Sequence, residues 1–335
     1  MAVIRTKNYS IILAKNAFAE IKEHLKGFSG KTFHLLIDEN VFRLYEDTIK
    51  RAFNDLPHAI TLLPTGENTK SFAVLEATLQ QLIDKQIKRN DGIIAIGGGV
   101  VGDLAGLVAS LIYRGIDYIQ VPTTLLAMVD SSIGGKTAIN LPQGKNLIGH
   151  FYEPKKVIID PNFLATLEAK EVLSGLAEVL KAALIGDATL FENLRLNKPI
   201  DEDTIERAIR VKLEVVKKDP YDTHLRHVLN FGHTYGHAIE QFYRYRIPHG
   251  EAVALGMIQA LELGVKLAIT PPGIANEIKT LIRKMKLINA SMPQKNALHN
   301  YLQHDKKSNS KDIRFVFLKA YQEPVIKRLS WEVFE

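Results

Sequence analysis

The chain has 335 residues, of which 46% are hydrophobic, and a formal net charge of +6. This composition is typical of a folded globular protein, and the length is sufficient for two domain cores. Because the sequence contains no cysteine, disulfide bonds, thiolate metal sites and cysteine nucleophiles are excluded, and a metal could be held only by histidine and carboxylate groups.

The distribution of charged and apolar residues indicates the kind of partner to expect. Basic residues are spread through the sequence and interleaved with acidic ones, which favours an anionic small molecule over nucleic acid. The first ten residues lack the apolar core of a signal peptide. The longest apolar stretch, residues 93–112, is interrupted by glycines and Asp103, which is unlike a membrane-spanning helix. We therefore expect a cytoplasmic protein with no membrane or nucleic-acid partner.

Hydrophobic periodicity divides the chain into two halves. Short apolar runs alternate with helical stretches at residues 33–38, 59–63, 92–96, 118–121 and 156–160, a pattern typical of a parallel sheet with crossover helices. After residue 161 helical periodicity dominates, and only residues 313–318 and the region near Val325 are expected to be extended. The pattern predicts an α/β domain over residues 1–165 and a mostly helical domain over residues 166–335.

A glycine-rich segment follows the third predicted strand. The segment Gly97-Gly98-Gly99-Val100-Val101-Gly102 fits the Gly-x-Gly-x-x-Gly pattern, and its place between a strand and a helix is typical of a phosphate-binding turn. A dinucleotide fingerprint normally follows the first strand of its domain. The segment is therefore open to two interpretations, a phosphate site or a tight turn that needs glycine for its backbone.

A second segment, expected to be a loop, runs from Asp130 through Gly134-Gly135-Lys136-Thr137. It ends like a nucleotide-binding P-loop, but Asp130 occupies the position of the first glycine and would repel a triphosphate. A P-loop nucleoside triphosphatase is therefore excluded, and Lys136 is a candidate anion ligand. Asn140, Lys145 and Asn146 follow closely and add further groups that could bind phosphate or hydroxyls.

Three histidines and a buried carboxylate form a candidate metal site. His233 and His237 are four residues apart, so spacing alone pairs them on one helix face, and His249 follows. Glu178 and Lys181 lie within an apolar, hence buried, helical run, where they must either neutralise each other or serve a site. One carboxylate with two imidazoles is typical of a catalytic metal site. Thr234 stands where a metalloprotease needs its glutamate, and structural histidines bonded to backbone carbonyls are the alternative.

The chain resembles the 3-dehydroquinate synthases over nearly its whole length. The motifs that carry the resemblance occur in both predicted halves. They are Gly97 to Asp103, Val121 to Asp130, Gly134 to Thr137, Lys145-Asn146, Gly175 to Lys181, Arg226 to His233, and His249-Gly250-Glu251.

The resemblance implies a fold and a reaction. It implies a Rossmann-like α/β domain that binds NAD, a helical domain that binds one divalent metal (zinc or cobalt), and an active site in the cleft between them. The implied reaction converts the sugar phosphate 3-deoxy-D-arabino-heptulosonate 7-phosphate into 3-dehydroquinate and phosphate in the shikimate pathway of aromatic amino acid biosynthesis. NAD removes a hydride, phosphate leaves by β-elimination, and the hydride returns, so the enzyme is a lyase. A homodimer is expected.

The resemblance also implies residue roles. The implied metal ligands are Glu178, His233 and His249, which assigns His237 to proton transfer instead of the metal. The implied cofactor-binding residues are Asp38, Asn40, Glu67, Lys70, Gly98, Gly99, Val100, Gly102, Asp103, Thr123, Thr124, Asp130, Lys136 and Lys145. The implied catalytic and substrate-binding residues are His237, Asp130, Arg114, Lys136, Lys145, Asn146, Lys181, Arg226, Asn230, Asp222, where the family often has glutamate, and one of Lys306 and Lys307.

Three alternatives stay open at this point. Another sugar-phosphate cyclase, making a deoxy-inosose or a valiolone, would share most of the motifs, although Lys306, Asn230 and His237 together favour the dehydroquinate type. A metal-dependent polyol dehydrogenase would share the fold but catalyse net oxidation. A catalytically inactive binding module would be expected to have lost at least one ligand position, and none is lost.

Overall fold

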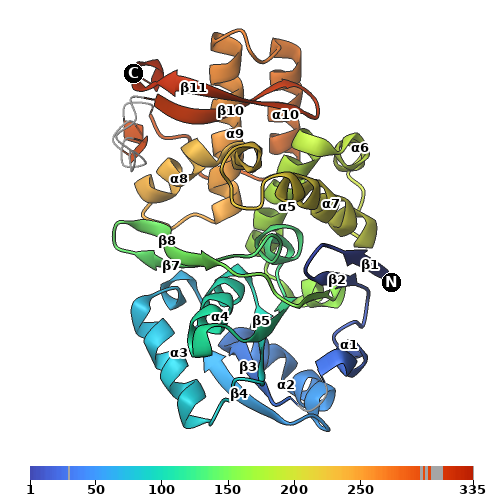
Figure 1. Cartoon of the computed structure of the whole chain (residues 1–335). Helices are drawn as coiled ribbons and strands as arrows, with labels where there is room; N and C mark the ends of the chain where they lie inside the picture. Colours follow the sequence, from blue (N-terminus) through green and yellow to red (C-terminus); the bar gives the residue numbers. More distant parts are fainter. Residues whose placement is uncertain (29–30, 295–296, 299–300, 303–311, 335) are drawn as a thin grey trace. The chain divides into compact units, whose positions relative to one another are not determined.

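The computed structural model describes residues 1–28, 31–294, 297–298, 301–302 and 312–334 (Figure 1). The chain divides into two compact units, Met1–Leu167 and Glu168–Glu335. Unit 1 is built around a seven-stranded sheet and unit 2 is mostly helical. The predicted fold class, an α/β half followed by a helical half, is confirmed.

The sheet of unit 1 is parallel apart from one edge. Its strands lie in the order β1-β2-β9-β6-β5-β3-β4, and only β1 pairs antiparallel with its neighbour. Five strands match the apolar runs in the sequence, whereas the β1–β2 hairpin was not predicted. The strands are β1 (Ala2–Arg5), β2 (Ser10–Leu13), β3 (Phe33–Asp38), β4 (His58–Leu63), β5 (Gly92–Gly97), β6 (Asp117–Pro122) and β9 (Lys156–Ile159).

The strand order explains why the glycine-rich segment follows the third predicted strand. Counting only the five predicted strands, the spatial order is second, first, third, fourth, fifth. In sheets with this order the connections reverse direction between the first and third strands, and ligands bind beyond the carboxyl ends of the strands at that point. Gly97 ends β5, the third of these strands, next to the end of β3. The segment therefore lies at the expected ligand-binding edge.

Helices cover the sheet because alternate residues of each strand face opposite sides. Leu36, Ile93 and Ala95 belong to one buried cluster with Leu104 and Val108 of α4. Their strand neighbours therefore face the other side of the sheet. The helices of unit 1 are α1 (Ile21–His24), α2 (Glu39–Phe53), α3 (Phe72–Asp84) and α4 (Gly99–Leu111), with short turns η1 (Lys26–Phe28), η2 (Glu67–Thr69), η3 (Ile112–Arg114), η4 (Ala127–Ser131) and η5 (Pro161–Thr166).

The segment after Asp130, expected to be a loop, is instead an antiparallel hairpin. Its strands are β7 (Lys136–Leu141) and β8 (Gly144–Phe151). The hairpin packs on α4, where Ile139 joins the buried cluster. A side chain at Gly106 of α4 would overlap Thr137. The prediction failed because turn-forming glycines flank the segment, whereas its strand character depends on packing against α4.

Unit 2 is organised around helix α9. Every residue from Gly250 to Ala260 is buried, and α9 packs against α5, α8 and α10. A side chain at Gly256 would overlap the carbonyl of Gly232, so α8 and α9 approach unusually closely. The elements are α5 (Ala169–Gly186), α6 (Ala188–Arg195), α7 (Glu202–Lys218), η6 (Leu225–Asn230), α8 (His233–Phe242), α9 (His249–Lys266), α10 (Pro272–Lys284), β10 (Asp312–Ala320), β11 (Glu323–Ser330) and η7 (Trp331–Phe334).

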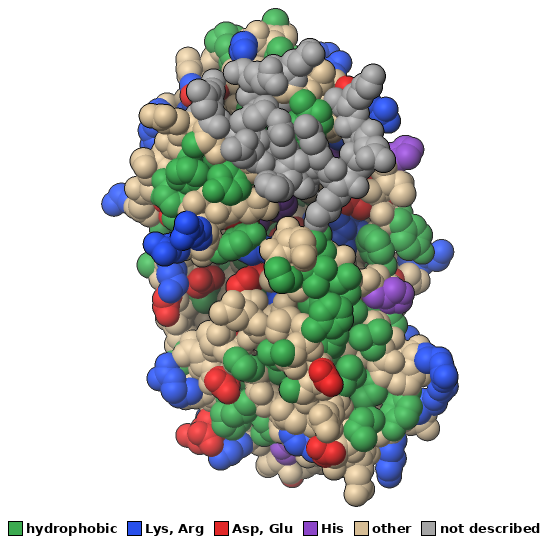
Figure 2. Space-filling view, turned by 90° about the vertical axis from the view of Figure 1, so that its left-hand side faces the viewer, with side chains coloured by type: hydrophobic (Ala, Val, Ile, Leu, Met, Phe, Trp, Pro, Cys, Tyr) green, Lys and Arg blue, Asp and Glu red, His purple; other side chains and the backbone are tan. Residues whose placement is uncertain are grey.

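Two surface properties bear on the partners of the chain. Among the described residues, no helix combines the length and apolar character needed to cross a membrane. On the face shown in Figure 2, Lys and Arg side chains occur in several separate groups, with Asp and Glu side chains between them. The basic side chains visible on this face therefore do not form one continuous patch.

Candidate active site

The side chains of Glu178, His233 and His249 meet within unit 2. Glu178 lies in the middle of α5, while His233 and His249 are the first residues of α8 and α9. One ligand atom from each residue can be chosen so that all lie within 4.8 Å of one another. The close packing of α8, α9 and α5 thus brings three distant sequence segments to one point.

The geometry of this group fits a divalent metal ion. Nε2 of His233 and Nε2 of His249 each lie 3.5 Å from Oε1 of Glu178. Ligands that surround one zinc at about 2.0 to 2.2 Å in a tetrahedron are themselves about 3.3 to 3.6 Å apart. Both carboxylate oxygens of Glu178 are buried without a regular hydrogen bond, although Oε2 forms an ion pair with Lys181. A buried carboxylate in this situation is suited to a cation.

The charges of the group are strongly coupled. Burial by itself would raise the pKa of Glu178, but Lys181 and the two facing imidazoles hold this pKa well below its usual range. Burial and the charge of Lys181 lower the pKa of His233 to about 3, which leaves that ring neutral, as metal binding requires. Burial also acts to lower the pKa of His249, but the nearby carboxylates of Glu178 and Glu240 outweigh it and raise the pKa to about 10.

His237 lies beside the group without joining it. Its ring centroid is 5.5 Å from that of His233 and 6.4 Å from that of His249, and its side chain is exposed. The cluster of ligand atoms includes His249 and not His237. The rings of His233 and His237 are in contact, as their spacing suggests, but the group of ligand atoms joins His233 with His249. Helical spacing registers only neighbours on one helix, whereas His249 comes from another.

The segment before α8 carries three further predicted residues. Arg226 and Asn230 lie in η6, and Asp222 precedes it with a left-handed backbone (φ 58°). Arg226 is 2% exposed, and its guanidinium donates to the carbonyl of Pro220 at 2.6 Å. Asn230 contacts His227 through its side-chain amide. The buried guanidinium is therefore held at a fixed position by its own loop.

Most of the predicted cofactor residues lie at the carboxyl edge of the sheet in unit 1. Asp38 ends β3 and accepts hydrogen bonds from the backbone of Asn40 and Val41, which makes it the N-cap of α2. Gly98 is the N-cap of α4, so the first backbone amides of that helix, which have no partner within the helix, lie at this edge. The other predicted residues at this edge are Glu67 and Lys70 after β4, Gly99, Val100, Gly102 and Asp103 in α4, and Thr123 and Thr124 after β6.

A polar cluster links this edge to the β7–β8 hairpin. Nζ of Lys70, only 5% exposed, lies 2.5 Å from Oδ2 of Asp103 and also donates to the side chain of Asn146. The side chain of Asn140 donates to Glu67 at 2.7 Å and accepts from the backbone of Asn146 at 2.9 Å. The structure thus brings together residues that the sequence places in three separate motifs.

The remaining predicted residues of unit 1 lie in η4, in the β7–β8 hairpin and in η3. Asp130 is in the π-helical turn η4, Lys136 is exposed at the start of β7, and Lys145 is in β8. Arg114 is exposed after α4, with a left-handed backbone (φ 65°). Lys306 and Lys307 lie outside the described residues.

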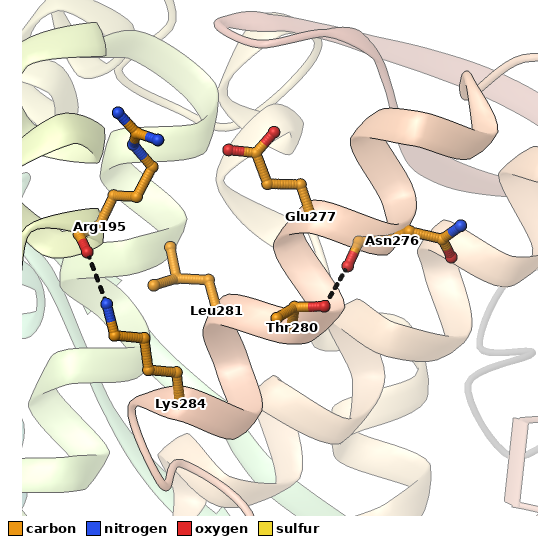
Figure 3. Close-up of a pocket in the computed structure, with 6 residues that line it drawn as sticks. All are labelled: Arg195, Asn276, Glu277, Thr280, Leu281 and Lys284. Atoms are coloured by element: carbon orange, nitrogen blue, oxygen red, sulfur yellow. Dashed lines mark hydrogen bonds between the residues drawn. The ribbon is translucent and has the colours of Figure 1, made fainter.

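A surface pocket elsewhere in unit 2 contains none of the predicted residues. It is lined by residues of α6 and α10, namely Arg195, Asn276, Glu277, Thr280, Leu281 and Lys284 (Figure 3). Lys284 donates to the backbone carbonyl of Arg195, and Glu277 accepts from Tyr321. Because these polar groups already have partners, the pocket does not resemble an active site.

Two residues near the predicted site were missed by sequence analysis. Glu240 is buried in α8 and faces His249, and Asp219 is buried at the end of α7 and accepts hydrogen bonds from Thr223, His224 and Arg226. For Glu240 the sequence held a signal, because positions 233, 237 and 240 share one helix face. The role of Asp219 depends on a non-helical loop that no periodicity describes.

Comparison with known proteins identifies the family. The family model described as the 3-dehydroquinate synthase N-terminal region matches residues 60–174, and the C-terminal one matches residues 175–308. The chain belongs to the 3-dehydroquinate synthase family. The 3-dehydroquinate synthase of Clostridium botulinum is 40% identical, over 99% of this chain and 98% of that protein.

Solved structures share the fold of this 3-dehydroquinate synthase family member. A crystal structure of 2-deoxy-scyllo-inosose synthase with carbaglucose-6-phosphate, NAD⁺ and Co²⁺ superposes with a TM-score of 0.87 at 25% identity, covering 97% of this chain and 95% of that one. An NADH-dependent butanol dehydrogenase from Thermotoga maritima has a TM-score of 0.70 at 14% identity, covering 99% of this chain and 96% of that one. The latter likeness concerns the fold alone.

Proposed function

We propose that this chain catalyses the reaction of its family, the conversion of 3-deoxy-D-arabino-heptulosonate 7-phosphate into 3-dehydroquinate and phosphate. The observation that carries the proposal is the grouping of Glu178, His233 and His249 in a chain that is 40% identical to a 3-dehydroquinate synthase over almost its full length. A carboxylate with two imidazoles leaves a coordination position open for substrate.

In this proposal Glu178, His233 and His249 hold one divalent metal, zinc or cobalt. A metal bound there would polarise substrate hydroxyls and lower their pKa, which favours hydride loss. Lys181, paired with Glu178, limits the net negative charge of the ligand group. His237 is exposed beside the ligands and does not bind the metal in this proposal. It serves in proton transfer to and from the substrate.

Residues 1–165 form the NAD-binding domain in this proposal, and residues 166–335 bind metal and substrate. The helix end at Gly98 and Gly99 suits a pyrophosphate, because the amides of a helix N-terminus favour anions. Asp38, Asn40, Glu67, Lys70, Asp103, Thr123 and Thr124 surround that edge. NAD bound there would accept a hydride and return it within one catalytic cycle.

The phosphate and carboxylate of the substrate require positively charged or amide donors. Lys136, Lys145, Asn146, Arg226 and Asn230 supply them, since charge-assisted hydrogen bonds to such groups are the stronger ones. Asp130, Asp222, Arg114 and one of Lys306 and Lys307 complete the proposed set. We further propose that the enzyme acts as a homodimer in the cytoplasm, where a dinucleotide and a sugar phosphate are both available.

One experiment separates the proposed reaction from its rivals. The full-length protein is incubated with NAD, Zn²⁺ and the heptulosonate phosphate, and phosphate, NADH absorbance and product NMR are followed. The expected result is phosphate equal to substrate consumed, 3-dehydroquinate as product, and NADH well below the enzyme concentration, because the hydride returns to the same molecule. NADH that accumulates with turnover would point instead to a dehydrogenase. A parallel incubation with glucose 6-phosphate as the sugar phosphate tests the other rival: turnover there, with none of the heptulosonate phosphate, would point to an inosose-type cyclase.

A further inference from the structure

Both histidine ligands of the proposed metal centre are held at their second ring nitrogen. His233 directs Nε2 toward Glu178, while its Nδ1 lies 3.3 Å from the backbone carbonyl of Phe231. His249 also directs Nε2 toward Glu178, and its Nδ1 lies 3.3 Å from Oε2 of Glu240. The two rings therefore present the same nitrogen to Glu178, but the partners of the other nitrogen differ: a neutral carbonyl for His233 and a carboxylate for His249.

We propose that Glu240 is a positioning residue of the metal centre. Its carboxylate accepts the Nδ1 proton of His249 and so fixes the ring in the orientation that directs Nε2 toward the proposed metal position. This inference rests on the proposed function of Glu178, His233 and His249. A carboxylate or carbonyl behind a metal-bound histidine fixes the tautomer and orientation of the ring and makes it a stronger ligand.

The burial of Glu240 supports a specific task. The residue is only 1% exposed, and a carboxylate at such a depth is costly unless a charged or hydrogen-bonding partner compensates for lost hydration. Its distance to His249 places that partner at the proposed metal centre. Glu240 follows His233 by seven residues on α8, so the same helix face supplies one metal ligand and the group behind another.

The charge balance of the centre gives Glu240 a second effect. A divalent ion and Lys181 would together bring three positive charges next to Glu178, which carries one negative charge. The carboxylate of Glu240 adds a second negative charge behind His249. Because charges interact more strongly in a buried environment than in water, removal of this charge is expected to weaken cation binding more than loss of a neutral hydrogen bond would.

Glu251 provides a matched control. It is also a buried glutamate, 8% exposed, and lies in α9 two residues after His249. Its carboxylate accepts hydrogen bonds from the backbone of Asn289 and Ala290. Glu251→Gln therefore removes the charge of a buried carboxylate in the same unit. The hydrogen bonds given for that carboxylate are to the backbone of a loop and not to a proposed metal ligand.

The test measures metal affinity of the metal-free, full-length protein. Zn²⁺ binding is followed by calorimetry and Co²⁺ binding by its visible absorption, for wild type, Glu240→Gln, Glu240→Ala, Glu251→Gln and His249→Ala, with circular dichroism to verify folding. We expect Glu240→Ala to bind Zn²⁺ roughly 10- to 100-fold more weakly. Glu240→Gln should fall between it and wild type, because an amide oxygen still accepts the Nδ1 proton but carries no charge. Glu251→Gln should bind as wild type does.

The outcomes distinguish this inference from the metal assignment. An altered Co²⁺ spectrum in the Glu240 variants, together with an unchanged spectrum in Glu251→Gln, supports the positioning role. A purely structural effect would not change the spectrum of the bound ion. Wild-type affinity and spectrum in Glu240→Gln and Glu240→Ala would overturn it. If Glu240→Ala does not fold, the glutamine variant alone decides in the same way. Failure of the wild-type protein to bind metal, or full binding by His249→Ala, would refute the proposed metal site itself.

Discussion

His34 is a buried titratable residue on strand β3 of the sheet. It is 1% exposed, and its Nε2 lies 3.5 Å from Oδ2 of Asp91. Asp91 in turn accepts hydrogen bonds from the backbone of Thr32 and Lys88. Burial lowers the pKa of His34, and the neighbouring Asp91 opposes this effect only in part. The folded protein therefore holds this ring neutral at pH values where the unfolded chain protonates it.

This histidine predicts a loss of stability in mild acid. Below about pH 6.5, the pKa of an unperturbed histidine, the unfolded chain binds a proton that the folded chain does not, so the free energy of unfolding falls as the pH falls. One such group contributes a slope of at most about 1.4 kcal/mol per pH unit. The free energy of unfolding is measured by urea denaturation of wild type and His34→Gln between pH 5 and 8. It should depend less steeply on pH in the variant. Parallel curves would contradict the prediction.

At the scale of elements, the end of helix α7 determines where Arg226 lies. Asp219 is the C-cap residue of α7. Its carboxylate accepts hydrogen bonds from the backbone amides of Thr223, His224 and Arg226 at 3.0, 2.7 and 3.0 Å. It also accepts one from the hydroxyl of Thr223 at 3.0 Å. These bonds hold the pKa of Asp219 well below its usual range. The helix end thus anchors the loop that presents the guanidinium.

Loss of this anchor should impair substrate binding more than folding. We expect Asp219→Ala to lower kcat/KM by about tenfold or more, mainly through KM, because a misplaced Arg226 weakens one charge-assisted contact. Asp201→Ala is the matched control, since Asp201 caps the other end of α7 through Thr204 and its loss should cost about 1 kcal/mol of stability without a change in KM. Steady-state kinetics with thermal denaturation of both variants checks the prediction. An unchanged KM in Asp219→Ala would contradict it.

At the scale of the whole molecule, each unit has its own core and its own proposed ligand. Unit 1 buries the cluster between the sheet and α4, and unit 2 buries α9 among helices. A ligand that binds only folded protein stabilises the region that holds it, by about 2.7 kcal/mol at a free concentration one hundred times its Kd. The two proposed cofactors should therefore protect different parts of the chain.

Hydrogen exchange measured by mass spectrometry tests this separation. NAD added alone should slow exchange in peptides around Asp38, Lys70 and Gly98, whereas Zn²⁺ added alone should slow exchange around Glu178, His233 and His249. His249→Ala should lose the zinc effect and keep the NAD effect. Protection by zinc that is confined to residues 1–167 would contradict the assignment of the metal to unit 2.

The sequence by itself determined the class of fold and most of the elements. The apolar runs that became β3, β4, β5, β6 and β9 were recognisable, because a buried strand and an amphipathic helix each impose a local period on the chain. The resemblance to the 3-dehydroquinate synthases, confirmed by the family comparison, rests on motifs that are likewise local. Glycine, histidine and carboxylate groups at fixed spacing reveal the chemistry without revealing where the groups meet.

Only the tertiary structure decided which of these groups are neighbours. It places His249, and not His237, with His233 and Glu178, and it joins Lys70, Asp103 and Asn146 in one cluster. It also shows that the segment after Asp130 is a hairpin, and it brings Glu240 behind His249. The physical reason is the same in each case: these contacts join segments distant in sequence through the packing of helices and strands, and a local period carries no information about the partner on another element.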